Sequence, residues 1–497
     1  MKLKIIRQLS FRPPLPDIYG AKDYRDKRAV YELMDDLIFR AGLDDQFIKF
    51  VLEERQLTPD RVGNRFLNHC VTAFRTNIVR FVENHLPVRE LSIQLADSHL
   101  MQWFCHVAEF GSVLAPSKST LDRYGRFLPQ DKIDQLSVQL LQAASQQSDG
   151  HSEQALGLNQ AINLTNVWLD TFCLKANIHY PTDWVLLIDA TRTLMKATLL
   201  IRNAGLKNRM PQSPEEFLRD MNKLGIAMGQ QRRRKDSKRN RKKILRLMKR
   251  LIRRTQQHAQ KHRDLLESRW QETKWTRPQA KQIQERIDGV LAQLPAAEKQ
   301  AHERLIGGRQ MKSSEKIHSL YESEVQLIVR GKLSAEVEFG NQVLLGEQED
   351  GLLMHTQLQE KVVSDSKSLI QGVERIQERF RIELEGVCAD RGFGSKANEK
   401  WLGKEVDYLC PRQIEALREK MKNSEFARRQ RRRSQTEGRI SIFVHRFLGD
   451  LLRVKGLENR EAAVGWATLS HNVWKLAQMR KKQAEERERH EQEQQAA

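Results

Sequence analysis

A cationic run in the middle of the chain limits how this protein can fold more than any other feature. Between Gln231 and Arg254 the sequence holds fourteen Lys or Arg residues and one acid, Asp236. A hydrophobic core cannot take in so many charges, so this segment must stay at a surface. Apolar residues recur within it at helical spacing, namely at Ile244, Leu247, Met248 and Leu251. The pattern predicts a long basic helix, paired in a hairpin with a second helix over Gln282–Ala301.

Segments with β-strand character occur on both sides of this basic insertion. Before it, Leu164–Tyr180 has alternating apolar residues, and a helical pattern follows over Trp184–Ile201. After it, short apolar runs occur at Val325–Val329, Glu336–Gly346, Gly386–Ala389 and Val406–Pro411. Helical patterns lie between and beyond them, over Ser366–Phe380, from Glu437 onward, and over Ala462–Met479. Strands that alternate with helices indicate an α/β domain.

The insertion therefore divides the α/β domain into two parts. We place the first part at residues 160–203, the insertion at 204–318 and the second part at 319–480. Residues 1–155 read as a separate helical domain, with helices over Ala29–Ala41 and Phe66–Phe81. Residues 481–497 are rich in Glu, Gln and Arg and predict a solvated charged tail.

Two short helices with a break between them are predicted in the N-terminal part, within Val88–Leu121. Pro87 suits the start of the first helix, and Ser117 can cap a later one. Such an arrangement is compatible with a helix-turn-helix DNA reader. A plain helical bundle fits the same pattern equally well.

The composition favours a polyanionic partner. The formal net charge is +21, with 85 Lys and Arg against 64 Asp and Glu, which predicts binding to nucleic acid or to an anionic membrane surface. We find no apolar run long enough to span a membrane and no export signal. The five cysteines form no CxxC pair, so zinc ribbons and a disulfide framework are disfavoured and a reducing cytoplasm fits. Cys173 and Cys388 are expected to be small core residues, and His258 and His262 solvated surface residues.

Three carboxylates are candidates for one metal-dependent site. Asp170 lies inside a strand-like run, Asp390 follows another such run, and Glu437 is expected to begin a helix. Ligands gather at the carboxyl ends of strands in open α/β sheets, so these residues can converge. Mg²⁺ prefers oxygen ligands and keeps several waters, so three carboxylates suffice for a pair of ions. Two metals can hold the attacking and leaving oxygens of a displacement at phosphorus.

The order of the motifs around these acids resembles that of the DDE transposases of bacterial insertion sequences. The similar segments are Asp170–Thr171 with Asn177–Asp183, Val329–Lys332, Val337–Gly340, Ala389–Phe393 and Glu437–Ser441, with Val464–Trp466 and His471–Asn472 beyond them. Val88–Phe104 is similar to the helical module that such transposases use on their DNA ends. The family commonly places Lys or Arg two turns beyond the glutamate, whereas this chain has Val444, next to His445 and Arg446.

The resemblance implies a fold and a function. The catalytic domain would be a ribonuclease-H-like mixed sheet flanked by helices, in which Asp170, Asp390 and Glu437 hold two Mg²⁺ ions, for which Mn²⁺ can substitute. The protein would bind the ends of its mobile element and a target duplex, self-associate in a synaptic complex, and cleave and join DNA in the cytoplasm, near the nucleoid. Contacts to DNA are expected from basic residues in the insertion and the motifs, which are Arg232, Arg233, Arg234, Lys235, Lys332, Arg391, Arg439 and Arg446.

Two other classes of function remain open from the sequence. The chain could be a catalytically inactive nucleic-acid-binding protein derived from a transposase. It could also bind a membrane surface through the basic amphipathic helix of the insertion. The arginine run Arg428–Arg433 fits either a solvated face or a phosphate-binding segment.

Overall fold

The computed structural model describes residues 12–109, 111–146, 156–178, 183–231, 236–309, 311, 315–322, 324–332, 335–449, 452 and 454–496. The chain forms two compact units. Unit 1 comprises residues 1–175 and 341–497, and unit 2 comprises residues 176–340. Unit 1 is therefore built from two separate stretches of sequence, and unit 2 is inserted between them.

The N-terminal part of unit 1 is almost entirely helical. Its helices are α1 (Lys22–Arg40), α2 (Leu43–Glu54), α3 (Asn64–Val82), α4 (Val88–Asp97), α5 (His99–Phe104), α6 (Lys118–Tyr124) and α7 (Gln130–Ser145), with a 3₁₀ turn at Pro59–Arg61. A hairpin of β1 (Ala108–Glu109) and β2 (Ser112–Val113) separates α5 from α6. Ser117 caps α6 by accepting a hydrogen bond from the Thr120 N–H at 3.4 Å. Helix α5 is largely buried, so α6 is the exposed helix of this segment.

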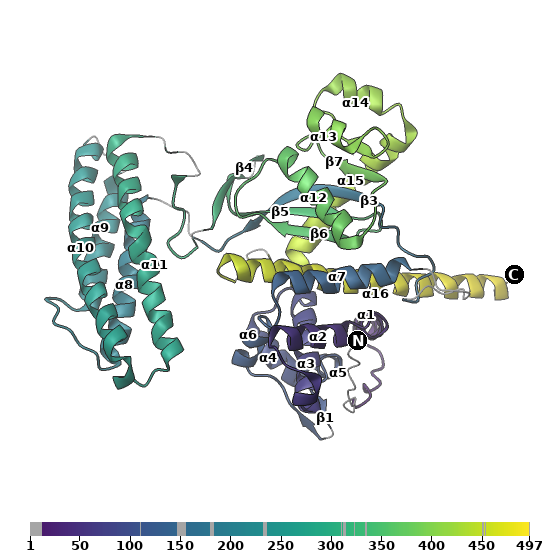
Figure 1. Cartoon of the computed structure of the whole chain (residues 1–497), viewed down its shortest axis with the longest axis horizontal. Coiled ribbons are helices and arrows are strands. Elements are labelled where there is room, and N and C mark those ends of the chain that lie inside the picture. Colours follow the sequence, from purple (N-terminus) through teal and green to yellow (C-terminus); the bar gives the residue numbers. More distant parts are fainter. Residues whose placement is uncertain are drawn as a thin grey trace. The chain divides into compact units, whose positions relative to one another are not determined.

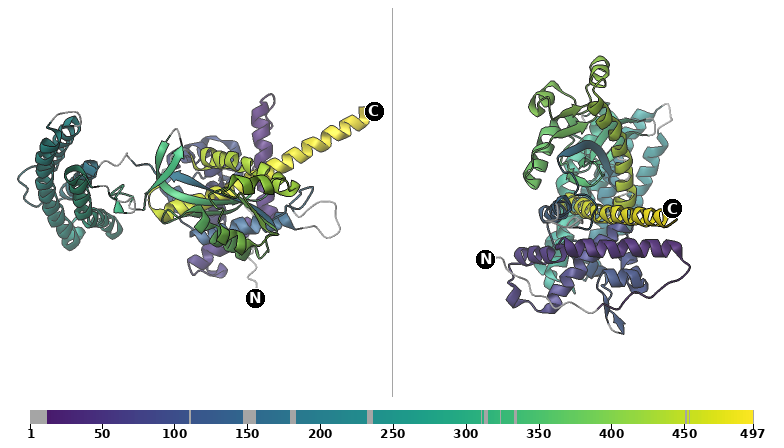
Figure 2. Two further views of the ribbon diagram at one scale, coloured as in Figure 1. Left: turned by 90° about the horizontal axis from the view of Figure 1, so that it is seen from above. Right: turned by 90° about the vertical axis from the view of Figure 1, so that its right-hand side faces the viewer.

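These helices share one hydrophobic core with the C-terminal helix α16 (Leu457–Ala496). Trp466 of α16 packs between Phe47 and Phe74, with ring centroids 6.0 Å from each. The segment 1–155, predicted as a separate domain, thus belongs to the same compact unit as the sheet. Beyond Arg480 the charged tail continues α16 as an exposed helix, which projects away from the rest of unit 1 (Figure 2).

A mixed sheet flanked by helices forms the α/β part (Figure 1). Its strands are β3 (Asn166–Lys175), β4 (Gln326–Lys332), β5 (Ala335–Glu347), β6 (Leu353–Leu358), β7 (Gly386–Ala389) and β8 (Asp407–Leu409). The order is β4-β5-β3-β7-β8, and β6 also pairs with β5. β5 is antiparallel to β4 and β6, whereas β7 is parallel to β3 and β8. β6 was not predicted.

Further helices follow the strands of unit 1. They are α12 (Asp365–Phe380), α13 (Lys396–Leu402), α14 (Ile414–Lys420) and α15 (Ser424–Ile442), with a π-helical turn at Phe443–Leu448. The prediction that a helix begins at Glu437 is wrong, because α15 begins thirteen residues earlier. Asn423 caps it by accepting a hydrogen bond from the Phe426 N–H at 2.9 Å. The arginine run that separates this cap from Glu437 is therefore part of the same helix.

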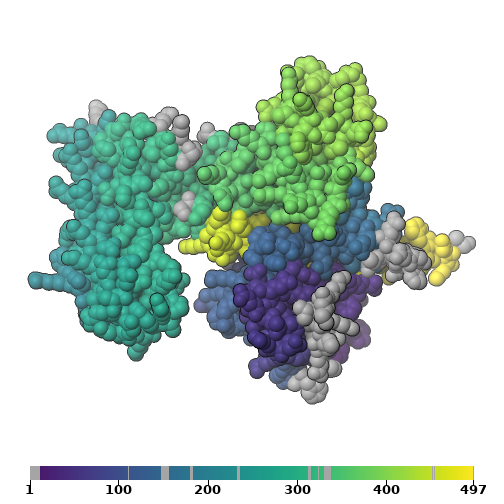
Figure 3. Space-filling view, in the orientation of Figure 1, coloured from purple at the N-terminus to yellow at the C-terminus, as the bar shows by residue number. Residues whose placement is uncertain are grey.

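Unit 2 contains four long helices, α8 (Asp183–Asn203), α9 (Pro214–Gln230), α10 (Ser237–Arg269) and α11 (Arg277–His302), with short turns at Trp270–Glu272 and Glu303–Gly307 (Figure 1). They pack around their own core, which includes Leu194, Phe217, Met248 and Leu294. The predicted basic helix and its hairpin partner are α10 and α11. Helix α8, which we had assigned to the catalytic domain, packs here because its apolar face contributes to this core. In the space-filling view the four helices form a densely packed body (Figure 3).

Candidate active site

Asp170 lies on the central strand β3, where the pairing with β7 ends. The register pairs Leu169 with Ala389, so Asp170 and Asp390 follow directly on two neighbouring parallel strands. One oxygen of Asp170 accepts a hydrogen bond from the Thr171 N–H at 2.7 Å. Burial raises the pKa of Asp170 to about 6, and the charges of Asp390 and Glu437 raise it further, against the opposing Thr171 N–H and Arg433. All three predicted carboxylates therefore lie within electrostatic reach of one another.

Asp390 occupies the turn after β7 and is held by the backbone. Its Oδ1 accepts a hydrogen bond from the Gly392 N–H at 2.8 Å. A Cβ atom on Gly392 would lie 3.0 Å from Asp390 Oδ1 and 2.7 Å from Asp365 Oδ2. Position 392 must therefore be glycine if both carboxylates are to stay in place. This contact also shows that Asp365 lies beside Asp390.

Asp365 is a fourth carboxylate that the sequence analysis missed. It is the first residue of α12, and its Oδ1 accepts hydrogen bonds from Thr171 Oγ1 at 2.9 Å and Gln342 Nε2 at 3.1 Å. Thr171 follows Asp170, so Asp365 connects the segments that carry the first two acids. Its position before a helical pattern reads as an ordinary acid of the first turn, and no signal in the sequence distinguished it from that.

Glu437 reaches the site from α15. Its side chain is 71% exposed, and its Oε1 lies 3.8 Å from a guanidinium nitrogen of Arg433, one turn earlier. We had considered that Glu437 might serve only to face a helix N-terminus. Its position in the fourth turn of α15 excludes that role, because the helix dipole acts mainly over the first turn.

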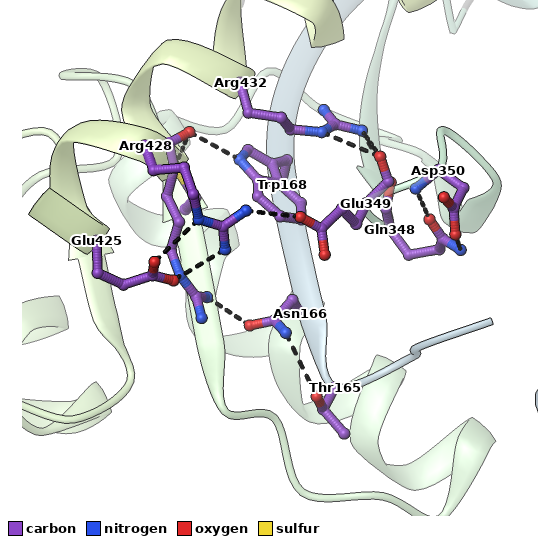
Figure 4. Close-up of polar contacts among 11 residues, drawn as sticks. Thr165, Asn166, Trp168, Gln348, Glu349, Asp350, Glu425, Arg428 and Arg432 are labelled. Atoms are coloured by element: carbon purple, nitrogen blue, oxygen red, sulfur yellow. Dashed lines mark hydrogen bonds and ion pairs between the residues drawn. The ribbon is translucent and has the colours of Figure 1, made fainter. Parts of the chain in front are cut away.

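The arginine run of α15 anchors this helix to the sheet (Figure 4). Arg432 forms an ion pair with the fully buried Glu347 of β5, donates to the Gln348 carbonyl at 2.9 Å, and stacks 4.4 Å from the Trp168 ring. Arg428 pairs with Glu349 at 2.8 Å and with Glu425 at 2.9 Å. Trp168 donates its indole N–H to the Arg429 carbonyl at 3.1 Å. These arginines hold Glu437 over β3 and are engaged within the protein.

The donor chemistry of the site fits a hard cation, because every candidate ligand is a carboxylate. Among the residues that the structure describes, however, no three His, Cys, Asp or Glu side chains are gathered closely enough to hold a metal ion. Asp170 and Asp390 are anchored by backbone N–H groups, whereas Glu437 extends into solvent. Rotation of one exposed side chain is thus the adjustment with the least steric hindrance.

The other candidate residues fall into three groups. Arg391 is exposed beside Asp390. Arg439 lies 3.4 Å from Glu347, and Arg446 stacks 4.1 Å from the Trp474 ring, so both have partners within the protein. The side chains of Arg232, Arg233, Arg234, Lys235 and Lys332 lie outside the described residues.

Two side predictions have clear outcomes. All five cysteines are free and buried, which confirms that Cys173 and Cys388 are core residues. The prediction that His262 is solvated is wrong, because the residue is fully buried. Its Nδ1 donates to the His258 carbonyl at 2.7 Å, and its Nε2 faces the Asn208 N–H at 3.4 Å. A position on the core side of α10 explains its burial.

Replacing Asp170 with Asn is expected to stabilise the protein at neutral pH. The unfolded carboxyl ionises near its model value of 3.8, whereas the folded one ionises near pH 6. Above pH 6 the folded state therefore bears the cost of a buried charge, and this cost disappears as the pH falls from 6 toward 3.8. We expect Asp170→Asn to raise the free energy of unfolding by on the order of 2 kcal/mol at pH 7.5, with no gain below about pH 4.

Urea unfolding at both pH values measures this difference. The same substitution at the exposed Asp60 is the control and should change little. A gain that is equal at the two pH values would show that it does not arise from ionisation of Asp170.

Comparisons with protein-family models, with curated proteins and with solved structures found no match.

Proposed function

We propose that this protein is a DDE-type transposase, which binds the ends of a mobile element and catalyses metal-dependent cleavage and strand transfer of DNA. The observation that carries the proposal is the meeting of Asp170, Asp390 and Glu437, from three distant segments, at the end of two parallel strands. Three acids brought together at a cost in burial and repulsion favour a role in function over one in stability.

The topology supports a ribonuclease-H-like catalytic domain. A meander of antiparallel strands leads into parallel strands joined through helices, with the first acid on the central strand and the second after its parallel neighbour. Helix α15 then carries the third acid across this end of the sheet. The arrangement is the one that the motif order implied.

Asp170, Asp390 and Glu437 would hold two Mg²⁺ ions, with Mn²⁺ as a substitute. When bound, the ions would supply a nucleophilic oxygen and stabilise the leaving oxygen of an in-line displacement. The chain's own contribution is to fix the acids: backbone N–H groups orient Asp170 and Asp390, and Asp365 holds Thr171 beside them. The raised pKa of Asp170 means that this ligand becomes available above about pH 6.

DNA is the proposed substrate, and the cytoplasm, near the nucleoid, is the proposed location. Cleavage and joining of two ends would require self-association in a synaptic complex. No helix among the described residues is long and apolar enough to cross a membrane.

A catalytically inactive DNA-binding protein is the second candidate. The observation that favours it is that, among the residues described, no three potential ligands are already gathered for a metal. Binding to DNA does not separate the two candidates, because both predict it.

Strand cleavage separates them. The full chain would be incubated with a duplex carrying the DNA that flanks its gene, including any inverted repeats. We expect single-strand nicks at the repeat ends with Mg²⁺ or Mn²⁺, and none with EDTA or Ca²⁺ alone. Specific end binding without any metal-dependent cleavage would favour the inactive protein.

A further inference from the structure

The two halves of helix α10 differ in charge. Its first half, from Lys238 to Arg254, contains ten Lys or Arg residues and no acid, and eight of the ten side chains are exposed. Its second half contains Asp264 and Glu267 as well as cations. The excess of positive charge in unit 2 is thus concentrated on one part of one helix.

The cations of the first half lie on one face. At 3.6 residues per turn, one stripe follows the side of the helix opposite the buried residues Leu245, Met248 and Ile252. We call this stripe the cationic face, and it comprises Arg239, Lys242, Lys243, Arg246, Arg250 and Arg253. Neighbouring cations along it are about one helical turn apart, roughly 5 Å.

The cationic face has no acidic partners. In the part of unit 2 that the structure describes, none of its six side chains lies within ion-pair distance of a carboxylate. The second half of the helix differs, because Arg263 pairs with Asp288 at 3.0 Å and Arg269 pairs with Glu272 at 2.5 Å. Six like charges without counter-charges repel one another and stabilise nothing within the unit. A polyanion outside the chain would supply the missing charge.

We infer that the cationic face of α10 binds the phosphate backbone of duplex DNA without reading its sequence. The spacing of its cations is on the scale of the spacing of phosphates along a strand. The face has no aromatic residue, so it cannot stack on bases. A regular row of Lys and Arg at a rigid helix contacts phosphates and positions the duplex.

The structure also argues against the membrane alternative. An interfacial helix must insert its apolar face among the lipid chains. In α10 that face is buried in the core of unit 2, against α8, α9 and α11. Only the charged face is available, and binding through charge alone favours a dense line of phosphates.

This inference rests on the proposed function only for the identity of the polyanion as DNA, and it requires none of the chemistry. The test is a fourfold variant of the full chain, with Arg239, Lys242, Arg246 and Arg250 all changed to Gln. Affinity for a random duplex would be measured between 50 and 200 mM salt. Each lost phosphate contact removes about 0.9 from the slope of log affinity against log salt. We expect the slope to fall in magnitude by about 3.

A matched variant of unit 2 controls for net charge, with Lys261, Arg269, Lys281 and Lys299 changed to Gln. Three of these cations form ion pairs, with Glu272, Glu285 and Glu303, and none lies on the cationic face. We expect its slope to change by less than about 1. Equal flattening by both variants would overturn the inference, because net charge would then account for the binding.

Two further arms make the outcome specific. Vesicles of phosphatidylserine and phosphatidylcholine should not displace the duplex from the wild-type protein, and displacement would move the face to a membrane. Strand cleavage is measured in the same preparations. A flattened slope with no cleavage in wild type would sustain the inference while the proposed function fails, and cleavage with an unchanged slope would do the reverse.

Discussion

Replacing any one of Asp170, Asp390 or Glu437 with Ala is expected to reduce strand cleavage by about 10³-fold or more, while binding to element ends stays nearly intact. Each carboxylate would be a metal ligand, so its loss removes the stabilisation of charge that develops during the displacement. The measurement is cleavage of labelled end DNA in Mg²⁺, with affinity for the same DNA determined in Ca²⁺.

Glu385→Ala is the matched control. Glu385 precedes β7, at the strand end opposite Asp390, and accepts a hydrogen bond from Thr165 Oγ1 at 2.8 Å. This variant should cleave like wild type. If Asp390→Ala retained cleavage within a few-fold of wild type, the assignment of the second ligand would be wrong.

The second large effect is expected at Glu347. This carboxylate is fully buried, pairs with Arg432, accepts from Thr436 Oγ1 at 2.8 Å and lies 3.4 Å from Arg439. Glu347→Ala would leave two guanidinium groups largely buried without a counter-charge. Removal of one partner from a buried ion pair costs about 3–5 kcal/mol, and we expect a loss of that size in urea unfolding. Cleavage should fall too, since α15 carries Glu437.

Glu349→Ala provides the comparison, two residues away. Glu349 pairs with Arg428 at 2.8 Å, but both side chains are about half exposed, so the loss should stay below about 1 kcal/mol. The double variant Glu347→Leu with Arg432→Leu removes the central pair and should recover part of the stability. A loss below 1 kcal/mol for Glu347→Ala itself would mean that α15 is not anchored through this residue.

Periodic patterns predicted much of the fold. The strand around Asp170 and the long basic helix were recognisable because each has a regular apolar repeat. The start of α15 was not, because an arginine run carries no apolar signal and its helix is stabilised by partners on distant strands, Glu347 and Glu349. β6 was missed, since its pairing with β5 depends on tertiary contacts that local patterns do not report.

The site shows the same division. Asp170, Asp390 and Glu437 were found because short motifs surround them in a recognisable order. Asp365 stands in no motif, and its relation to Thr171 and Gly392 exists only after the chain has folded. The assignment of α8 also failed for a tertiary reason, because its apolar face fits two neighbours equally well until the core of unit 2 is known.

The discontinuity of unit 1 bears on how the protein is made. During synthesis, unit 2 leaves the ribosome complete, with its own core, and can fold at once. The N-terminal helices must wait, because Trp466, which packs against Phe47 and Phe74, is synthesised near the end. A nascent chain therefore carries a finished basic bundle alongside an unfinished partner for DNA, and the complete protein appears only close to termination.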